Sequence, residues 1–294
     1  MERRRFLQTV GAGSGLSVAG CLTDRSPAGA VDGGPLDLAA TTTVHDSGLL
    51  DGLLSGFEDR FGVRVKPVIR GSGAALRTAA DGDVDVVLVH ARPLEDGFLR
   101  AGDGVNRRTV MVNDFLVVGP AADPAGVAGA EVLEAYTRIA AAEATFLSRG
   151  DRSGTHLREQ QLWEATGIKP SGDWYRETGQ GMGNTLSAAK ELDAYTLSDR
   201  GTFLATRTGD LEVLVATGLA DPPPALRNEY ATIATNPAPH TTTYPLAMAF
   251  IGYLTGPGQE VIGEYELGGE PAFRPIGLSE SPAFSQYVPS GWTP

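Results

Sequence analysis

The stretch LDLAATTT, residues 36–43, decides the fold class of this chain. Residues 36–40 alternate as in a β-strand, and the three threonines interrupt that alternation. The residues from Asp46 to Phe61 then place leucine and phenylalanine on one helical stripe. The same order recurs when Val63 to Ile69 leads into Gly71-Ser72-Gly73 and a helical pattern from Ala74 to Ala80. Strands followed by short hydroxyl or glycine loops and helices predict an α/β architecture.

A third strand completes this first unit, and a second unit of the same kind follows further along the chain. Val84 to Val89 reads as a strand buried on both faces, as in a parallel sheet. Two extended segments, Asp114 to Gly119 and Asn228 to Asn236, are placed to carry the chain to a second lobe and back. Between them we expect helices over 131–144 and 154–166, a strand over 145–148 and a helix from about Asn184; beyond them we expect C-terminal helices and a tail over 244–294.

Four loops of Thr, Ser or Gly each follow a predicted strand and precede a predicted helix; they cover residues 41–43, 71–73, 148–155 and 179–183. A helix N-terminus presents unpaired backbone N–H groups and positive partial charge, so these loops suit anions. The same residues are also ordinary helix caps. Two such loops in each half favour an anion site over four separate caps.

The most specific of these loops is SRGDRSGT, residues 148–155. Arg149 supplies a forked cation four residues before Ser153, and Ser153 and Thr155 add hydroxyl groups at a helix start. The alternative is that Arg149 pairs with Asp151 beside an ordinary serine cap. We expect Arg152 to face solvent.

The N-terminus reads as an export signal. Arg3-Arg4-Arg5 gives a twin-arginine start, and the apolar segment from Val10 to Gly20 is too short to span a bilayer. Cys21, the single cysteine, follows Val18-Ala19-Gly20 as in a lipobox, although a buried thiol is the alternative. We therefore predict a signal over 1–20, a tether over 21–35 and a protein held outside the cell membrane by lipid on Cys21.

Composition narrows the class of partner. The net charge of −12 argues against nucleic acid, and only Lys66, Lys169 and Lys190 are lysines among the 24 basic residues. An acidic, lysine-poor chain is typical of proteins from salt-loving archaea. The four histidines lack metal-ligand spacing, which disfavours a zinc site. A serine hydrolase built on Ser153 and His156 stays a weak alternative, because residues so close on one helix start rarely form a triad.

Several motifs, in order over residues 38–255, resemble those of the tungstate-binding proteins of tungstate ABC transporters: TTT (41–43) with DSGLL (46–50), VLVHA (87–91), GVNRR (104–108), NDF (113–115), SRGD (148–151), GQGMG (179–183) and AYTL (194–197). The resemblance implies the type II periplasmic-binding-protein fold, with two α/β lobes joined by a two-strand hinge. With the extended segments above, lobe 1 would comprise residues 36–115 and 233–294, and lobe 2 residues 116–232.

The resemblance also implies a non-enzymatic, monomeric carrier without a cofactor, which delivers tungstate or molybdate to ABC permease subunits. Its anion-binding residues fall on Thr42, Thr43, Ser72, Arg149, Ser153 and Thr155. Relatives often have Ser at the position of Thr43, so this departure keeps a hydroxyl. Phosphate and sulfate are the other candidate ligands, since the Arg-x-x-x-Ser-Gly-Thr spacing is similar to that of phosphate-binding proteins. A phosphate site needs a buried carboxylate, and we interpret Asp85, the nearest candidate, as structural.

Overall fold

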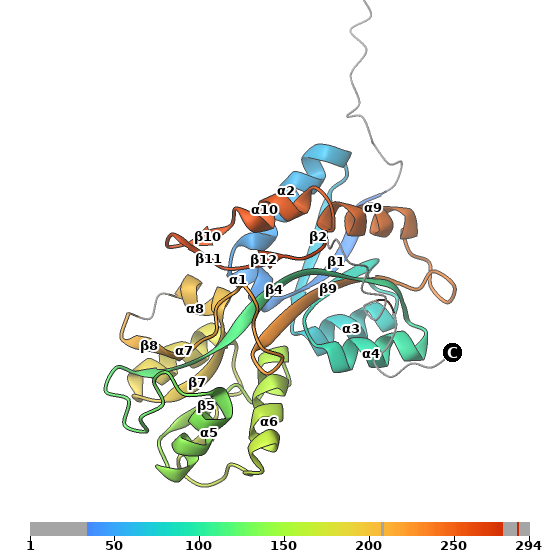
Figure 1. Ribbon diagram of the computed structural model, residues 1–294. Coiled ribbons are helices and arrows are strands. Elements are labelled where there is room, and N and C mark those ends of the chain that lie inside the picture. Colours follow the sequence, from blue (N-terminus) through green and yellow to red (C-terminus); the bar gives the residue numbers. More distant parts are fainter. Residues whose placement is uncertain (1–33, 207–208, 279–286, 288–294) are drawn as a thin grey trace, which may run out of the picture.

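The computed structural model describes residues 34–206, 209–278 and 287 (Figure 1). A mixed sheet with the strand order β2-β1-β3-β9-β4-β7-β5-β6 runs through the molecule, and β8 and β12 pair with β4. Its strands are β1 (Leu36–Thr41), β2 (Val65–Arg70), β3 (Val86–Val89), β4 (Gly104–Pro120), β5 (Phe146–Ser148), β6 (Tyr175–Glu177), β7 (Tyr195–Asp199), β8 (Leu211–Val215), β9 (Arg227–Thr235) and β12 (Arg274–Pro275). A separate hairpin joins β10 (Glu266–Leu267) to β11 (Glu270–Pro271).

The sheet has two parallel parts joined by long antiparallel strands. β1 pairs in parallel with β2 and β3, and β5 pairs in parallel with β6 and β7. Between these parts, β4 pairs with β9 on one side and with β7 on the other. β4 and β9 are therefore the two strands on which the chain passes from one part to the other.

Helices cover both faces of each part. They are α1 (Thr42–Asp46), α2 (Leu49–Phe61), α3 (Ser72–Ala80), α4 (Arg92–Ala101), α5 (Val132–Ala141), α6 (Gly154–Thr166), α7 (Met182–Glu191), α8 (Arg200–Thr206), α9 (Tyr244–Leu254) and α10 (Gly258–Gly263). α2, α9 and α10 pack on one face of the β1–β3 part, and α3 and α4 pack on the other. α5 and α6 cover one face of the β5–β7 part, and α7 covers the other.

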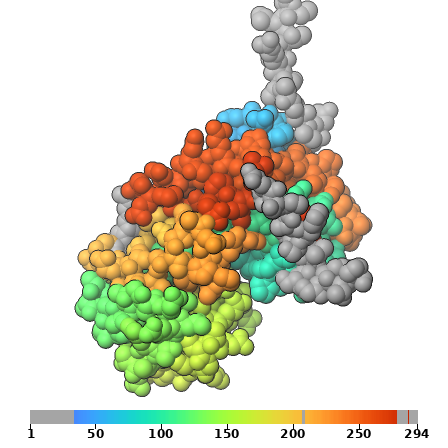
Figure 2. All heavy atoms as spheres, in the orientation of Figure 1, coloured from blue at the N-terminus to red at the C-terminus, as the bar shows by residue number. Residues whose placement is uncertain are grey.

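The buried apolar side chains form separate cores in the two parts. Met111 of β4 and Tyr230 of β9 belong to the core under α2 and α9, whereas Phe115 of β4 and Leu226, just before β9, belong to the core under α5 and α6. In the space-filling view the green to yellow middle of the chain forms one end of the molecule, and the blue and red segments share the other (Figure 2). At each of the two crossing strands, the chain therefore passes from one core to the other within a few residues.

Several helices begin earlier than the sequence predicts. Thr42 and Thr43, expected in a loop, open the short helix α1, and the loops at Ser72 and Met182 likewise belong to the first turns of α3 and α7. The expected helix from Asp46 to Phe61 is divided by Gly48, whose φ of +83° lies in the left-handed region that favours glycine. The hydroxyl groups therefore sit on helix N-termini themselves.

The C-terminal part also differs from a bundle of helices and a tail. Of the described residues there, 244–278 and 287, only those of α9 and α10 are helical, and the chain then forms the β10–β11 hairpin before β12 pairs with β4. Four elements, α4, α8, β6 and β8, were not predicted, because each has only a short sequence pattern. The predicted export signal, the lipid site Cys21 and nearly all of the tether lie outside the described residues. Among the helices that are described, none has the length and apolar character needed to cross a bilayer.

Candidate anion-binding site

The predicted donors lie at the carboxyl ends of parallel strands. Thr42 and Thr43 follow β1, and Ser72 follows β2 and a single glycine. In the other part of the sheet, Arg149 follows β5. Because parallel strands bring their carboxyl ends to one edge, each part collects its donors at one edge, where α/β proteins bind ligands.

His90 brings the two edges together. It follows β3, and its backbone N–H points to Ser72 Oγ at 3.4 Å. On its other side lies Gly154, the first residue of α6: a Cβ added there would be 2.7 Å from the His90 ring and 3.0 Å from the His90 carbonyl oxygen. Only a glycine permits this approach. Ser72 of one part and Ser153 and Thr155 of the other therefore flank the contact between His90 and Gly154.

The His90 ring belongs to a buried polar network at the crossing strands. Asn228 Nδ2 donates to Asn113 Oδ1 at 2.7 Å and to Tyr230 Oη at 3.1 Å, so Asn228 Oδ1 accepts from His90 Nδ1 at 2.8 Å. Burial lowers the pKa of His90 to about 4, although the bond to Asn228 opposes this. His90 is therefore neutral at pH 7, and it is a hydrogen-bonded core residue.

Thr43 reaches the same network. Burial raises the pKa of the Tyr230 hydroxyl well above its usual value, and the side chains of Asn228, Asn113 and Thr43 offset this in part. The Tyr230 ring also stacks on His90 with centroids 4.7 Å apart. Thr42, which precedes Thr43 in α1, is half-buried, and no hydrogen bond among the described residues involves the Thr42 side chain.

Arg149 is buried in the other part, with 4% of its side chain exposed. Its Nη2 donates to Asp151 Oδ2 at 2.5 Å, and Asp151 Oδ1 accepts from the Ser153 backbone N–H at 3.0 Å. Burial alone would raise the pKa of Asp151, but the Arg149 charge and the Ser153 hydrogen bonds lower it. The alternative contact between Arg149 and Asp151 is thus present, and Asp151 also binds the backbone of Ser153 at the start of α6.

The remaining polar side-chain atoms of this loop differ in whether they have a hydrogen-bond partner. Ser153 caps α6, its Oγ accepting from His156 N at 3.3 Å. In contrast, Arg149 Nε and Thr155 Oγ1 are buried and have no hydrogen-bond partner among the described residues. Buried donors are almost always satisfied in native proteins, so these two unpartnered donors, six positions apart, are available to a polar ligand. An oxyanion would satisfy both.

The fourth predicted loop is not part of this arrangement. Gly179, Gln180 and Gly181 are exposed before α7. The described contacts of Gln180 stay within its own loop, where its N–H donates to Thr178 Oγ1. A glycine-rich sequence at a helix start is therefore not sufficient to predict a buried donor.

Two buried carboxylates, Asp85 and Asp199, need to be located relative to the predicted donors. Asp85 lies at the opposite end of β3, roughly 16 Å from His90 at the usual strand rise. Its oxygens accept from Asp37 N at 2.9 Å and from Thr243 N at 2.6 Å, which confirms its structural role.

The other carboxylate, Asp199, lies at the carboxyl end of β7 and was not predicted from the sequence. It is fully buried, and its Oδ1 accepts from Thr202 N at 2.9 Å. Thr202 Oγ1 and Asp199 Oδ2 are also buried without a partner among the described residues. A strand end just before a helix is the only sequence signal that could have singled out Asp199.

The alternative chemistries find no support in the geometry. The His156 ring Nδ1 accepts from Arg152 N at 2.9 Å, and Ser153 Oγ accepts from the His156 backbone, so Ser153 and His156 do not form a nucleophile–base pair. Among residues 34–206 and 209–278, no three metal-binding side chains gather.

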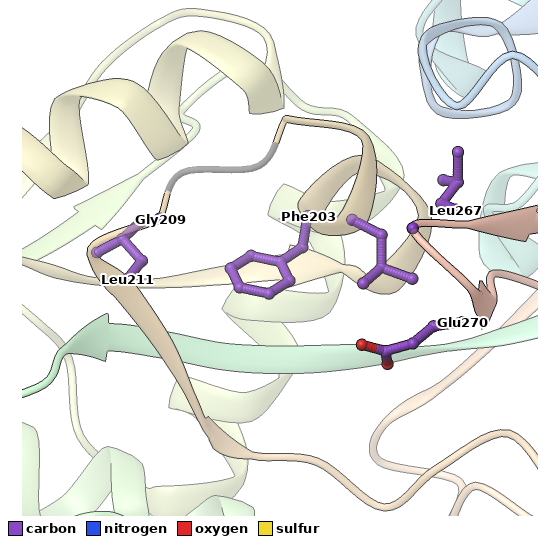
Figure 3. Close-up of a pocket in the computed structure, with 7 residues that line it drawn as sticks. Phe203, Gly209, Leu211, Leu267 and Glu270 are labelled. Atoms are coloured by element: carbon purple, nitrogen blue, oxygen red, sulfur yellow. The ribbon is translucent and has the colours of Figure 1, made fainter.

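A pocket between α8 and the β10–β11 hairpin is lined largely by apolar groups and has Glu270 at its edge (Figure 3). Phe203, Leu204 and Leu267 supply most of its side chains. Among the described residues that line it, the one charged group is the Glu270 carboxylate, which would repel an oxyanion. This pocket is therefore not the anion site.

Comparison with known proteins assigns the family. Residues 31–257 match the family model of the PBP superfamily domain. The chain is 51% identical to a candidate ABC transporter anion-binding protein of Haloferax volcanii, over 98% of this chain and 90% of that protein. It is 40% identical to the tungstate-binding protein TupA of Peptoclostridium acidaminophilum, over 88% of this chain and 93% of that protein.

A solved structure agrees with these relatives. The crystal structure of the tungstate ABC transporter from Geobacter sulfurreducens superimposes with a TM-score of 0.71 at 47% identity, covering 79% of this chain and 98% of that one. The predicted periplasmic-binding-protein fold is therefore confirmed. The chain belongs to the family of tungstate-binding proteins of ABC transporters, and it is a transport substrate-binding protein and not an enzyme.

Proposed function

We propose that this protein captures tungstate outside the cell and delivers it to an ABC importer, using Thr42, Thr43, Ser72, Arg149, Ser153 and Thr155 as anion-binding residues. The observation that carries the proposal is the pair of buried, unpartnered donors Arg149 Nε and Thr155 Oγ1 beside the contact of His90 with Gly154. Relatives named for tungstate binding support the choice of anion. Molybdate, with the same charge and nearly the same size, is the close competitor.

The mechanism is capture by closure. The two lobes rotate about β4 and β9. The bounds predicted from the sequence are 36–115 with 233–294 for lobe 1 and 116–232 for lobe 2, although Tyr230 of β9 packs in the core of lobe 1. An anion that contacts Ser72 on one lobe and Arg149 on the other stabilises the closed form, which the permease recognises. No covalent bond changes. A buried dianion is tolerated because Arg149 and neutral hydroxyl and N–H donors surround it.

Closure requires the glycine at the start of α6, and this gives a test of the function. Gly154→Ala places a methyl group 2.7 Å from the His90 ring and 3.0 Å from its carbonyl oxygen, which cannot yield as a flexible side chain would. Overpacking costs ~1–3 kcal/mol, so tungstate should bind roughly 10-fold more weakly. Calorimetry gives the affinity, and small-angle X-ray scattering gives the compaction that tungstate causes.

The matched control is Gly181→Ala, a change at another helix start where an added Cβ meets no atom within 4 Å. It should bind tungstate and compact like the unaltered protein. Full tungstate affinity in Gly154→Ala, or no compaction of the unaltered protein by tungstate, would contradict capture by closure.

The anchor is a separate proposal, supported by the sequence before the described residues. Cleavage of a twin-arginine signal over 1–20 and lipidation of Cys21 would hold a monomeric carrier at the outer face of the membrane through the 21–35 tether. The acidic, lysine-poor composition and the Haloferax relative support a high-salt exterior. Cys21→Ser should move the protein from the membrane to the soluble fraction with tungstate binding unchanged. A variant that stays on membranes would refute lipid anchoring.

A further inference from the structure

Asp199 is a buried carboxyl group that the proposed donor set does not use. It ends β7, lies opposite Phe115 of β4 and is 0% exposed. Oδ1 accepts from Thr202 N at 2.9 Å, whereas Oδ2 is buried without a partner among the described residues. A Cβ on Gly201 would lie 3.3 Å from Oδ1 and 3.0 Å from the Phe273 ring, so protein packs closely beside Oδ1. The unsatisfied atom is Oδ2.

The charges around Asp199 come from three elements. Arg149, after β5, is the cation that acts on Asp199, and the Tyr230 hydroxyl on β9 feels the Asp199 charge. The neighbouring Arg200 instead pairs with Asp114 of β4, through bonds of 2.6 and 2.9 Å. Among the described residues Asp199 forms no ion pair within 4.0 Å. Arg149, the cation that reaches it, already pairs with Asp151.

Charge counting then identifies a conflict. Arg149 and Asp151 neutralise one another, so an ionised Asp199 would leave the site with one negative charge before a dianion arrives. Burial raises the pKa of Asp199, and the hydrogen bond from the Thr202 backbone N–H and the Arg149 charge offset this only in part. A dianion beside an ionised Asp199 would raise that pKa further, because like charges disfavour each other's ionised form.

We propose that Asp199 is protonated when the site holds its anion and donates Oδ2–H to an anion oxygen, so that capture of one oxyanion takes up one proton. The inference rests on the proposed function. The proton comes from solvent and goes to the Asp199 carboxylate, and no other bond forms or breaks. Asp199 thereby adds a hydrogen-bond donor to a site that otherwise holds one cation. Because this donor needs an acceptor, it favours an anion whose oxygen is unprotonated.

The sign of the pH dependence follows. Because the bound form holds the proton more tightly than the empty form, tungstate binds best at low pH. The association constant should fall up to ~10-fold per pH unit between the pKa of the empty site and that of the occupied site. Below that window the affinity should be independent of pH.

The test is calorimetric titration of the purified protein with sodium tungstate between pH 7 and 9, in pairs of buffers with different ionisation enthalpies. The difference in heat gives the number of protons taken up. For the unaltered protein we expect uptake approaching one proton per tungstate within the window. Asp199→Asn keeps the shape and a donor, so it should still bind tungstate, with no proton uptake and little pH dependence.

Glu159→Gln is the control, because burial raises the pKa of Glu159 to about 7 and this group could also titrate. Glu159 accepts from Tyr175 Oη at 2.8 Å inside lobe 2 and is not one of the proposed anion-binding residues. Replacement of Glu159 should therefore leave proton uptake unchanged. Zero proton uptake by the unaltered protein over the whole range, or the same uptake in Asp199→Asn, would overturn the inference. This first outcome needs no variant to fold. Absence of any tungstate heat would instead refute the proposed function.

Discussion

Arg149→Ala is expected to weaken tungstate binding by at least ~2 kcal/mol, or roughly 30-fold. Arg149 is buried and is the one cation of the proposed donor set, and its Nε has no hydrogen-bond partner among the described residues. Removing one member of a buried charged pair typically costs ~2–5 kcal/mol. The loss also leaves Asp151 without its cation near the anion, which adds repulsion. Calorimetry with tungstate measures the change.

Arg152→Ala is the matched control, since Arg152 is exposed three residues further along the same loop. It should bind tungstate within about 2-fold of the unaltered protein, as expected for an exposed charge. Thermal unfolding of both variants shows whether either change acts through stability. Equal losses of affinity at Arg149 and Arg152 would mean that the loop contributes only a diffuse positive field.

Selectivity against phosphate is the second large effect. Tungstate and molybdate are fully deprotonated at neutral pH, whereas phosphate keeps at least one proton. We compare two complexes of equal total charge, each with a protonated Asp199: one holds the tungstate dianion and the other holds the monohydrogen phosphate dianion. The phosphate complex contains one proton more. That proton needs a second acceptor, yet Asp151 already accepts from Arg149 and Ser153, and Asp85 lies at the far end of β3.

A buried donor without an acceptor costs ~1–3 kcal/mol. Phosphate should therefore bind on the order of 100-fold more weakly than tungstate, taking the upper part of that range. Molybdate presents the same charge and the same number of protons, so its affinity should be comparable to that of tungstate or somewhat weaker. Sulfate is also unprotonated and differs mainly in size.

The sequence predicted features that depend on neighbouring residues. Helix α6 runs from Gly154 to Thr166 as expected, because Ser153 caps its start and Gly167, with φ of +72°, ends it. The strand–donor–helix order around Thr42 and Ser72 is equally local. The fold followed from this order together with the family resemblance. Individual helix starts shifted by a few residues because Ser and Thr suit both the loop and the first helical turn.

Features that depend on distant residues were not predictable in this way. The contact of His90 with Gly154 joins two parts of the chain that only the crossing strands bring together. Asp199 looks like any polar residue at a strand end, and its importance comes from burial and from Arg149, fifty positions earlier in the chain. The exposed loop at Gly181 has the same local pattern as the buried ones. Local pattern therefore identified possible donors, and tertiary packing decided which are buried.

The most direct test of the central claim is competition calorimetry of the purified protein at neutral pH. Tungstate should bind at one site per chain, and its apparent affinity should be unchanged by phosphate at the same concentration, while molybdate should compete. If phosphate displaced tungstate at similar concentration, the account of a donor site for unprotonated anions would be contradicted. Asp199 would then be the acceptor of a phosphate proton.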